Sequence, residues 1–312
     1  MPPLNEPPVY AELPELDGEK CAWKFFGPDD ALGTLNWLHP VRVASTAQAV
    51  TTGHVVNLDL PVDFATRLSI GRRPMRHTIL DISLGTDDFV DGYFLQSSSQ
   101  WDGFRHVRYR SHGFYGGHKR EEFENSDVIG VGAWAERGIA GRGVVLDVAA
   151  WAKTEGVRLD PAARTLISPE MLDAVLATQH SYLRPGDILL IRTGWLAWLR
   201  AQNADADLGN VGTLSCVGLD PSPRMAEWLW DRRVAAVAAD NPALEALPMI
   251  REDGLLHRRL LALLGMPIGE YWDLDELARL CSEAGRYDGL LISHPLNIPG
   301  GAGSPCNAVM IL

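Results

Sequence analysis

Polar side chains that could support hydrolysis are concentrated in residues 96–106, between an apolar stretch and a Gly-rich turn. Alternate residues of an extended strand point to the same side, so Gln96, Gln100 and Asp102 are predicted to present oxygen donors on one face. His106 follows closely enough for its imidazole to remove a proton from a water molecule held by those donors. This run is therefore the first candidate site.

The same run resembles the His-x-Gly-Thr-His-x-Asp-x-x-x-His pattern of the cyclase superfamily, which includes bacterial kynurenine formamidases, isatin hydrolases and other metal-dependent hydrolases. Gln96 and Gln100 stand where the family has its first two histidines, and Asp102 and His106 keep the family's residue types. In that family the two histidines and the aspartate bind metal, and the last histidine acts in proton transfer. The resemblance implies those roles for the matching positions here.

His257 and Glu270 form a second informative pair, because they resemble the downstream histidine and glutamate metal ligands of the same family. Taken alone, a histidine in an amphipathic helix is more often packed or exposed than a ligand. Its occurrence together with Asp102 and His106, in the family's order, favours one metal site held by Asp102, His257 and Glu270. Three protein ligands leave a position for water, and a bound divalent ion lowers the pKa of that water.

The two glutamines bear on the number and identity of the ions. An amide oxygen is a harder and weaker donor than an imidazole nitrogen, so Gln96 and Gln100 should weaken a second zinc position and shift preference toward manganese or magnesium. We expect one firmly bound divalent ion, manganese or zinc. Two alternatives stay open: the glutamines hydrogen-bond the substrate or neighbouring groups instead of the ion, or the site has lost its metal.

Three further residues are candidates for contacting a substrate. Tyr115 and His118 lie in the Gly-rich segment 111–118, which allows tight turns and close approach to a ligand. Asp240 follows a strand-like run, the position where ligands are often contacted in α/β proteins. The alternatives are that His112 and His118 are solvated loop histidines and that Asp240 caps the next turn.

Composition excludes several classes of partner. The 312 residues are 46% hydrophobic and carry a formal charge of −12 with scattered basic residues, which argues against nucleic acid. No apolar run approaches the ~20 residues of a membrane span, and the start lacks the order of a secretory signal. The same charge pattern favours a small-molecule substrate. Widely spaced cysteines favour reduced, buried thiols in a cytoplasmic protein. They are Cys21, Cys216, Cys281 and Cys306.

Periodicity along the chain predicts an α/β fold with layers of helices and strands. Residues 1–24 are expected to form an N-terminal arm that wraps a neighbour, and residues 25–312 a single catalytic domain. Expected helices are 41–50, 169–179, 222–232, 255–264 and 274–281. Expected strands are 55–60, 143–148, 188–193, 234–239 and 289–292.

Segments 33–36, 184–195 and 300–305 also resemble cyclase-family sequences in matching order, so the resemblance covers about residues 25–312. It implies a β/β/α arrangement with a central mixed sheet, and a homo-oligomer, either dimer or tetramer. The leading hypothesis is a metal-dependent hydrolase that cleaves an amide, lactone or related cyclic carbonyl bond in a small substrate, aromatic ones included. The alternatives are a lyase or ring-closing enzyme that moves a proton without adding water, and a metal-poor binding protein.

Overall fold

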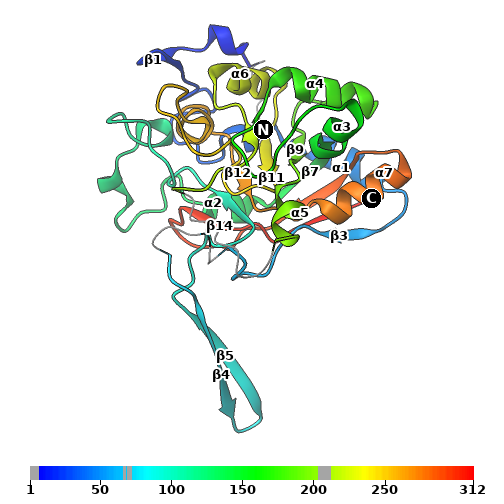
Figure 1. The fold of residues 1–312 in the computed structure, drawn as a ribbon. Helices are drawn as coiled ribbons and strands as arrows, with labels where there is room; N and C mark the ends of the chain where they lie inside the picture. Colours follow the sequence, from blue (N-terminus) through cyan, green and yellow to red (C-terminus); the bar gives the residue numbers. More distant parts are fainter. Residues whose placement is uncertain (1–6, 66–67, 69–71, 203–211) are drawn as a thin grey trace.

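A mixed sheet forms the centre of the computed structural model, which describes residues 7–65, 68, 72–202 and 212–312 (Figure 1). Its strands are β3 (Val55–Asn57), β6 (Gln100–Asp102), β7 (Ile139–Asp147), β9 (Ile188–Arg192), β11 (Ala236–Ala239), β12 (Ile268–Glu270), β13 (Asp288–Ser293), β14 (Gly303–Pro305) and β15 (Ala308–Ile311). They lie in the order β14-β6-β12-β11-β9-β7-β13-β15-β3. The predicted α/β class with a central mixed sheet is confirmed.

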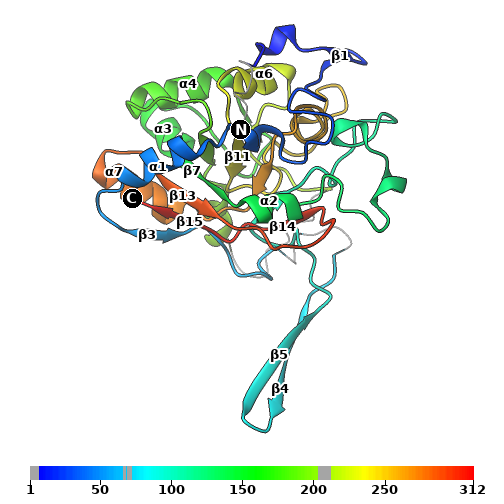
Figure 2. The ribbon, with the colours of Figure 1, turned by 180° about the vertical axis from the view of Figure 1, so that it is seen from behind.

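Helices cover this sheet, and α3, α4 and α6 lie together on one side of it in both views (Figures 1 and 2). The helices are α1 (Pro40–Gln48), α2 (Gly132–Arg137), α3 (Val148–Glu155), α4 (Pro169–Thr178), α5 (Trp195–Arg200), α6 (Pro223–Asp231), α7 (Asp275–Ala284) and the π-helix η6 (Arg258–Leu264). Short 3-10 turns are η1 (Tyr10–Glu12), η2 (Gly33–Trp37), η4 (Tyr115–Gly117) and η5 (Arg120–Phe123). Three two-stranded pairs lie outside the central sheet: β1 (Glu15–Leu16) with β2 (Glu19–Lys20), β8 (Leu166–Ile167) with β10 (Gly218–Leu219), and β4 (Arg76–Ile82) with β5 (Gly85–Asp91).

The middle of the sheet is built from parallel strands with continuous apolar sequence. β7, β9, β11 and β12 run parallel to one another, and residues 144–146 and 188–191 are fully buried. Burial on both faces explains why these strands contain runs of Val, Ile and Leu instead of alternating with polar residues. The helix after Ser168 begins as predicted, because the Ser168 side chain accepts from the Met171 N–H and Pro169 occupies the first turn.

Most of the predicted elements are present near their expected bounds. The predicted helices correspond to α1, α4, α6, η6 and α7, and the predicted strands to β3, β7, β9, β11 and β13. The extended run expected from Gln96 is wrong, because β6 begins only at Gln100 and turns and bends precede it. The hydroxyls of Ser97, Ser98 and Ser99 donate to backbone carbonyls elsewhere, which favours this irregular path over a strand.

The N-terminal segment packs on its own chain over residues 7–24. The Tyr10 N–H donates to Asp231 in α6, and the Ala22 N–H donates to the Leu263 carbonyl in η6. Glu19 pairs with the buried Arg259 of η6. The division of the chain at residue 25 stays a prediction.

Two sequence expectations concern the membrane and the thiols. All four cysteines are free and buried, in agreement with reduced thiols. None of the helices within the described ranges has the length and apolar content needed to cross a membrane.

Gly33 gives a test of how closely η2 fits the rest of the protein. Its φ of +53° is left-handed, and a Cβ added there would lie 1.9 Å from the Gly265 carbonyl oxygen. Gly53 is a matched control, because its φ is +72° and a Cβ would meet nothing within 4 Å. Each change to alanine should cost ~1–2 kcal/mol for the left-handed conformation. We expect Gly33→Ala to lose ~1–3 kcal/mol more, from the overlap with Gly265. Urea unfolding measures both values, and equal losses would contradict the packing described for η2.

Candidate metal centre

The pairing of β6 with β12 places the candidate ligands next to one another. Glu270 lies opposite Gln100 in this antiparallel pair, and Asp102 follows two residues along β6. Gln100 and Asp102 therefore share one face of the sheet, as alternation predicts. Trp101 points the other way and packs against Trp272 with ring centroids 4.8 Å apart.

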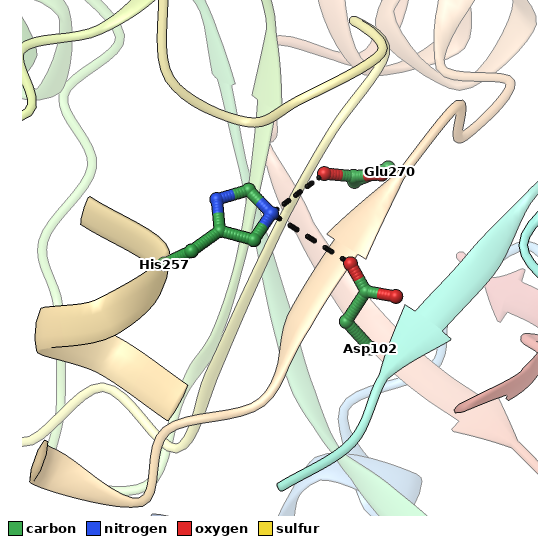
Figure 3. A group of neighbouring side chains, drawn as sticks. All are labelled: Asp102, His257 and Glu270. Atoms are coloured by element: carbon green, nitrogen blue, oxygen red, sulfur yellow. Dashed lines mark hydrogen bonds and ion pairs between the residues drawn. The ribbon is translucent and has the colours of Figure 1, made fainter. Parts of the chain in front are cut away.

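His257 completes a cluster with these two carboxylates (Figure 3). It lies at the start of η6, and its Nε2 is 3.0 Å from Oε1 of Glu270 and 3.7 Å from Oδ2 of Asp102. One potential ligand atom from each residue lies within 4.8 Å of the other two, and all three residues are buried. Ligands of a tetrahedral ion with bonds of ~2.1 Å lie ~3.4 Å apart, so the cluster needs little rearrangement to hold one cation.

The cluster has an excess of negative charge. His257 Nδ1 is 2.9 Å from Oε1 of Glu245, so three buried carboxylates surround one imidazole. Burial lowers the pKa of His257, but Glu245, Asp102 and Glu270 outweigh it and hold that pKa well above its ordinary value. Burial and the nearby Asp102 raise the pKa of Glu270 to about 7. Burial also raises the pKa of Asp102, but the nearby His106 and His257 outweigh this effect, and the pKa of Asp102 is lowered.

Two polar atoms at the cluster lack hydrogen-bond partners within the described chain: Oδ2 of Asp102 and Oε1 of Gln100. The Gln100 amide nitrogen donates to Oε2 of Glu270 at 2.7 Å and lies 3.4 Å from Oδ1 of Asp102. Burying an oxygen without a partner costs ~1–3 kcal/mol, and more when it is charged. The unsatisfied oxygens, the charge excess and the two-carboxylate, one-imidazole donor set all fit one divalent cation.

Glu245 orients His257 and was not among the residues singled out from the sequence. It is buried in the loop after β11, where its Oε2 also accepts from the Leu256 N–H. An Nδ1–H of His257 donated to Glu245 leaves Nε2 to face Asp102 and Glu270, the usual arrangement behind a metal-binding histidine. The sequence contains no spacing signal for this contact, because a loop brings the two residues together.

His106 lies at the more accessible side of the cluster. Its Nε2 is 3.7 Å from Oδ2 of Asp102, and its ring centroid is 6.4 Å from that of His257. The side chain is 29% exposed, whereas those of Asp102 and His257 are 0% and 6% exposed. A proton on His106 can therefore exchange with solvent more readily than one on either neighbour.

Gln96 and Arg72 lie beside the same edge of the sheet. A Cβ on Gly303 would lie 2.5 Å from the Gln96 amide nitrogen, and Gly303 pairs with Asp102 between β14 and β6. Arg72 donates to the Gln96 carbonyl. Its positive charge contributes to the lowered pKa of Asp102 and partly opposes the rise in the pKa of Glu270. The sequence analysis did not single out Arg72. Whether Gln96 or Gln100 binds metal stays a prediction.

The predicted substrate-contacting residues have partners within the chain. Tyr115 is buried and donates to Asp30, and Nδ1 of His118 lies 2.7 Å from Glu122. The buried carboxylate of Asp240 accepts from the Thr193 N–H and hydroxyl and from the Gly194 N–H. These contacts describe how Tyr115, His118 and Asp240 are held, and their roles toward a substrate stay predictions.

The fold and this cluster define a layered α/β protein with a potential metal centre beside one edge of a mixed sheet. A family model described as a cyclase matches residues 76–246, more than half of the chain. A solved structure described as a novel cyclase is 30% identical, with a TM-score of 0.81 over 94% of this chain and 97% of that one. The chain belongs to the cyclase family.

More distant structures share the fold. An isatin hydrolase bound to the product analogue thioisatinate is 17% identical, with a TM-score of 0.60 over 86% of this chain and 95% of that one. Isatin hydrolase A from Labrenzia aggregata, bound to benzyl benzoate, is 18% identical, with a TM-score of 0.58 over 85% and 96%. No curated protein matched the chain.

Glu245 provides a test of the metal centre that does not depend on knowing the substrate. Glu245→Gln should lower the affinity for Mn²⁺ or Zn²⁺ by ~10–100-fold, because the acceptor that orients His257 is weakened. Calorimetric titration of the metal-free protein measures this change. The control is Glu252→Gln, which removes the same charge at an exposed position of the same loop and should leave affinity unchanged. Equal affinity in both variants would contradict the role assigned to Glu245.

Proposed function

We propose that the chain is a divalent-metal-dependent hydrolase that cleaves an amide, lactone or related cyclic carbonyl bond in a small substrate, aromatic ones included. The buried convergence of Asp102, His257 and Glu270 carries this proposal, because acidic groups are rarely buried together without a compensating cation. Membership of the cyclase family supports an enzymatic role, and two neighbours with the same fold are described as isatin hydrolases. Four buried free thiols support action in the reducing cytoplasm.

In this proposal Asp102, His257 and Glu270 hold one manganese or zinc ion. A bound divalent ion supplies Lewis acidity, which makes water a stronger nucleophile near neutral pH and polarises a carbonyl. Gln100 fixes the carboxylates through its amide N–H groups, and Glu245 fixes the His257 ring.

His106 is the proposed proton-transfer residue. It is close enough to Asp102 to act at the same reacting centre, and its partial exposure allows its proton to be exchanged with solvent. The imidazole would take a proton from the attacking water and return one to the leaving group as the carbonyl bond breaks. Asp102 stabilises the protonated ring electrostatically, since its Oδ2 faces Nε2 of His106 at 3.7 Å.

The proposed role of His106 predicts a selective loss of turnover. A substrate is first identified by screening formyl-anilides, lactones and cyclic imides with added Mn²⁺ or Zn²⁺. His106→Ala should then lower kcat by ~10²–10⁴-fold, because the variant loses general acid-base catalysis. The bound metal should remain stoichiometric, because His106 is not one of the proposed metal ligands. His112→Ala is the control, since His112 pairs with Asp17 and should leave kcat unchanged. Full turnover by folded His106→Ala protein would overturn this assignment.

The family's description as a cyclase keeps a ring-closing or eliminating reaction as the second candidate. The two candidates differ in whether water enters the product. Turnover in H₂¹⁸O should add one solvent oxygen to the product of a hydrolase, detected as a mass increase of about 2 Da by mass spectrometry. A product formed without solvent oxygen would replace the hydrolase proposal with the lyase or cyclase one.

A further inference from the structure

A groove runs along α1, away from the metal centre. It consists of two adjoining pockets of about 350 Å³ and 170 Å³, which share Ser45, Thr46, Arg142 and Arg184 in their walls. α1 lies beside α7 in both views, and residues 285–288, directly after α7, line the larger pocket (Figures 1 and 2). Pockets that hold small molecules typically measure ~300–1,000 Å³, so this groove is large enough for one. We call it the α1 groove.

The α1 groove is separate from the metal centre. Arg142 and Asp288 place it on β7 and β13, which β9 and β11 separate from β12 and β6 in the sheet. Asp187 directly precedes β9, whereas Glu270 is the last residue of β12, which runs in the same direction. The groove therefore lies where the parallel strands begin, and the metal centre lies where they end. A ligand in the groove would leave the metal centre free.

The walls of the α1 groove carry more positive than negative charge. They contain four arginines and two aspartates, which give a formal charge of +2 on a chain whose total is −12. Salt screens charges that lie more than ~8–10 Å away, so a ligand in the groove interacts mainly with the walls. The groove therefore attracts anions although the whole protein is acidic. The charged residues are Arg42, Arg142, Arg184, Arg286, Asp187 and Asp288.

Two of the four arginines are paired with the aspartates. Arg142 is buried, and its guanidinium group bridges Asp187 at 2.7 Å and Asp288 at 2.8 Å. Arg286 also pairs with Asp288 at 2.8 Å and donates to the Ala49 carbonyl. A polar network whose members are all bonded is rigid, so these residues form a fixed base for the groove.

The other two arginines keep their charge available to a ligand. Arg42 and Arg184 are exposed, and neither forms an ion pair within the parts of the chain that the structure describes. Arg184 donates to the Tyr182 hydroxyl, and its guanidinium carbon lies 4.8 Å from the centroid of the Tyr182 ring. Arg42 passes close to Gly186, where an added Cβ would lie 3.7 Å from its Cδ. Both arginines line the smaller pocket together with Ser45.

We propose that the α1 groove binds a small molecule with a phosphate monoester group, which occupies the smaller pocket. Such a group carries ~1.5–2 negative charges near neutral pH and has three acceptor oxygens. Its charge matches the +2 of the walls, and its oxygens can accept from Arg42, Arg184 and Ser45, which belong to α1 and to the loop after α4. A carboxylate is planar and carries one charge, so it would engage one guanidinium fork and leave the other arginine unpaired.

The larger pocket provides contacts for the organic part of this molecule. Ala49, Tyr182 and Tyr287 line it with apolar surface, and the Tyr182 side chain is 55% exposed. His180 lines the same pocket, is exposed and has no hydrogen-bond partner within the described residues. Apolar walls with a few polar groups are typical of pockets that bind small organic molecules. The groove therefore suits a compact organic phosphate better than inorganic phosphate alone.

Isothermal titration calorimetry of the full chain tests the groove with inorganic phosphate and phenyl phosphate. Both should bind at one site per chain, and phenyl phosphate should bind more tightly because its ring reaches the larger pocket. Arg184→Gln and Arg42→Gln should each weaken phenyl phosphate binding by ~10–100-fold, because charge-assisted hydrogen bonds to the phosphate are lost. Arg158→Gln is the control, since it removes the same charge from a side chain that is 91% exposed and outside the groove.

Further arms of the titration separate the proposal from its alternatives. Arg184→Lys keeps the charge without the planar fork and should recover part of the affinity. EDTA should leave binding unchanged, because the groove does not include the metal centre. No binding of either probe, equal affinity of the groove variants and the control, or loss of binding in EDTA would overturn the proposal. Phenyl phosphate binding no tighter than inorganic phosphate would indicate an adventitious ion only, and tighter binding of succinate would indicate a dicarboxylate site instead.

Discussion

The structure around the site depends on one constraint, which is the burial of three carboxylates against a single imidazole. His257 contacts Glu245 and Glu270 directly and lies near Asp102, and all four residues are shielded from water. Even a protonated His257 carries too little charge to balance three carboxylates, and unbalanced charge is costly in such an environment. The arrangement is stable when protons, a nearby arginine or a cation supply the missing positive charge.

The fold holds these four residues in place from separate parts of the chain. β6 and β12 supply Asp102 and Glu270 from paired strands, so backbone hydrogen bonds fix the relative positions of the two carboxylates. His257 comes from the start of η6, and the Glu245 loop holds both His257 and the Leu256 N–H ahead of it. The cluster therefore keeps its geometry through secondary structure and one loop contact, with little freedom left to its side chains.

The sequence predicted those features that are encoded locally. The apolar runs of β7 and β9 and the Ser168-Pro169 start of α4 are local signals, and the structure confirms them. Asp102, His257 and Glu270 are far apart in the sequence and were predicted together only from their resemblance to the family's metal ligands, and the structure brings them together.

Features that depend on tertiary contacts were either not predicted from the sequence or predicted incorrectly. Glu245 and Arg72 reach the cluster through loops, and no spacing rule relates them to it. The strand expected from Gln96 is wrong because the Ser97 hydroxyl bonds to the nearby Phe94 carbonyl, whereas those of Ser98 and Ser99 bond to distant backbone. The β4–β5 hairpin was missed because its strands mix acidic and apolar residues on both faces, so neither face shows the regular alternation of a half-buried strand.

Gln100 shows how a change of residue type alters the charge balance of such a site. An imidazole can carry a positive charge or present a nitrogen lone pair to a metal, and the Gln100 amide does neither of these. Its amide nitrogen lies toward both Glu270 and Asp102, which holds the carboxylates in place without neutralising them. The remaining negative charge must be balanced by Arg72, by protons or by a cation in contact with Asp102 and Glu270. Gln100 stands where the family resemblance places a histidine, and its neutral amide leaves the charge balance of Asp102, His257 and Glu270 to these other groups.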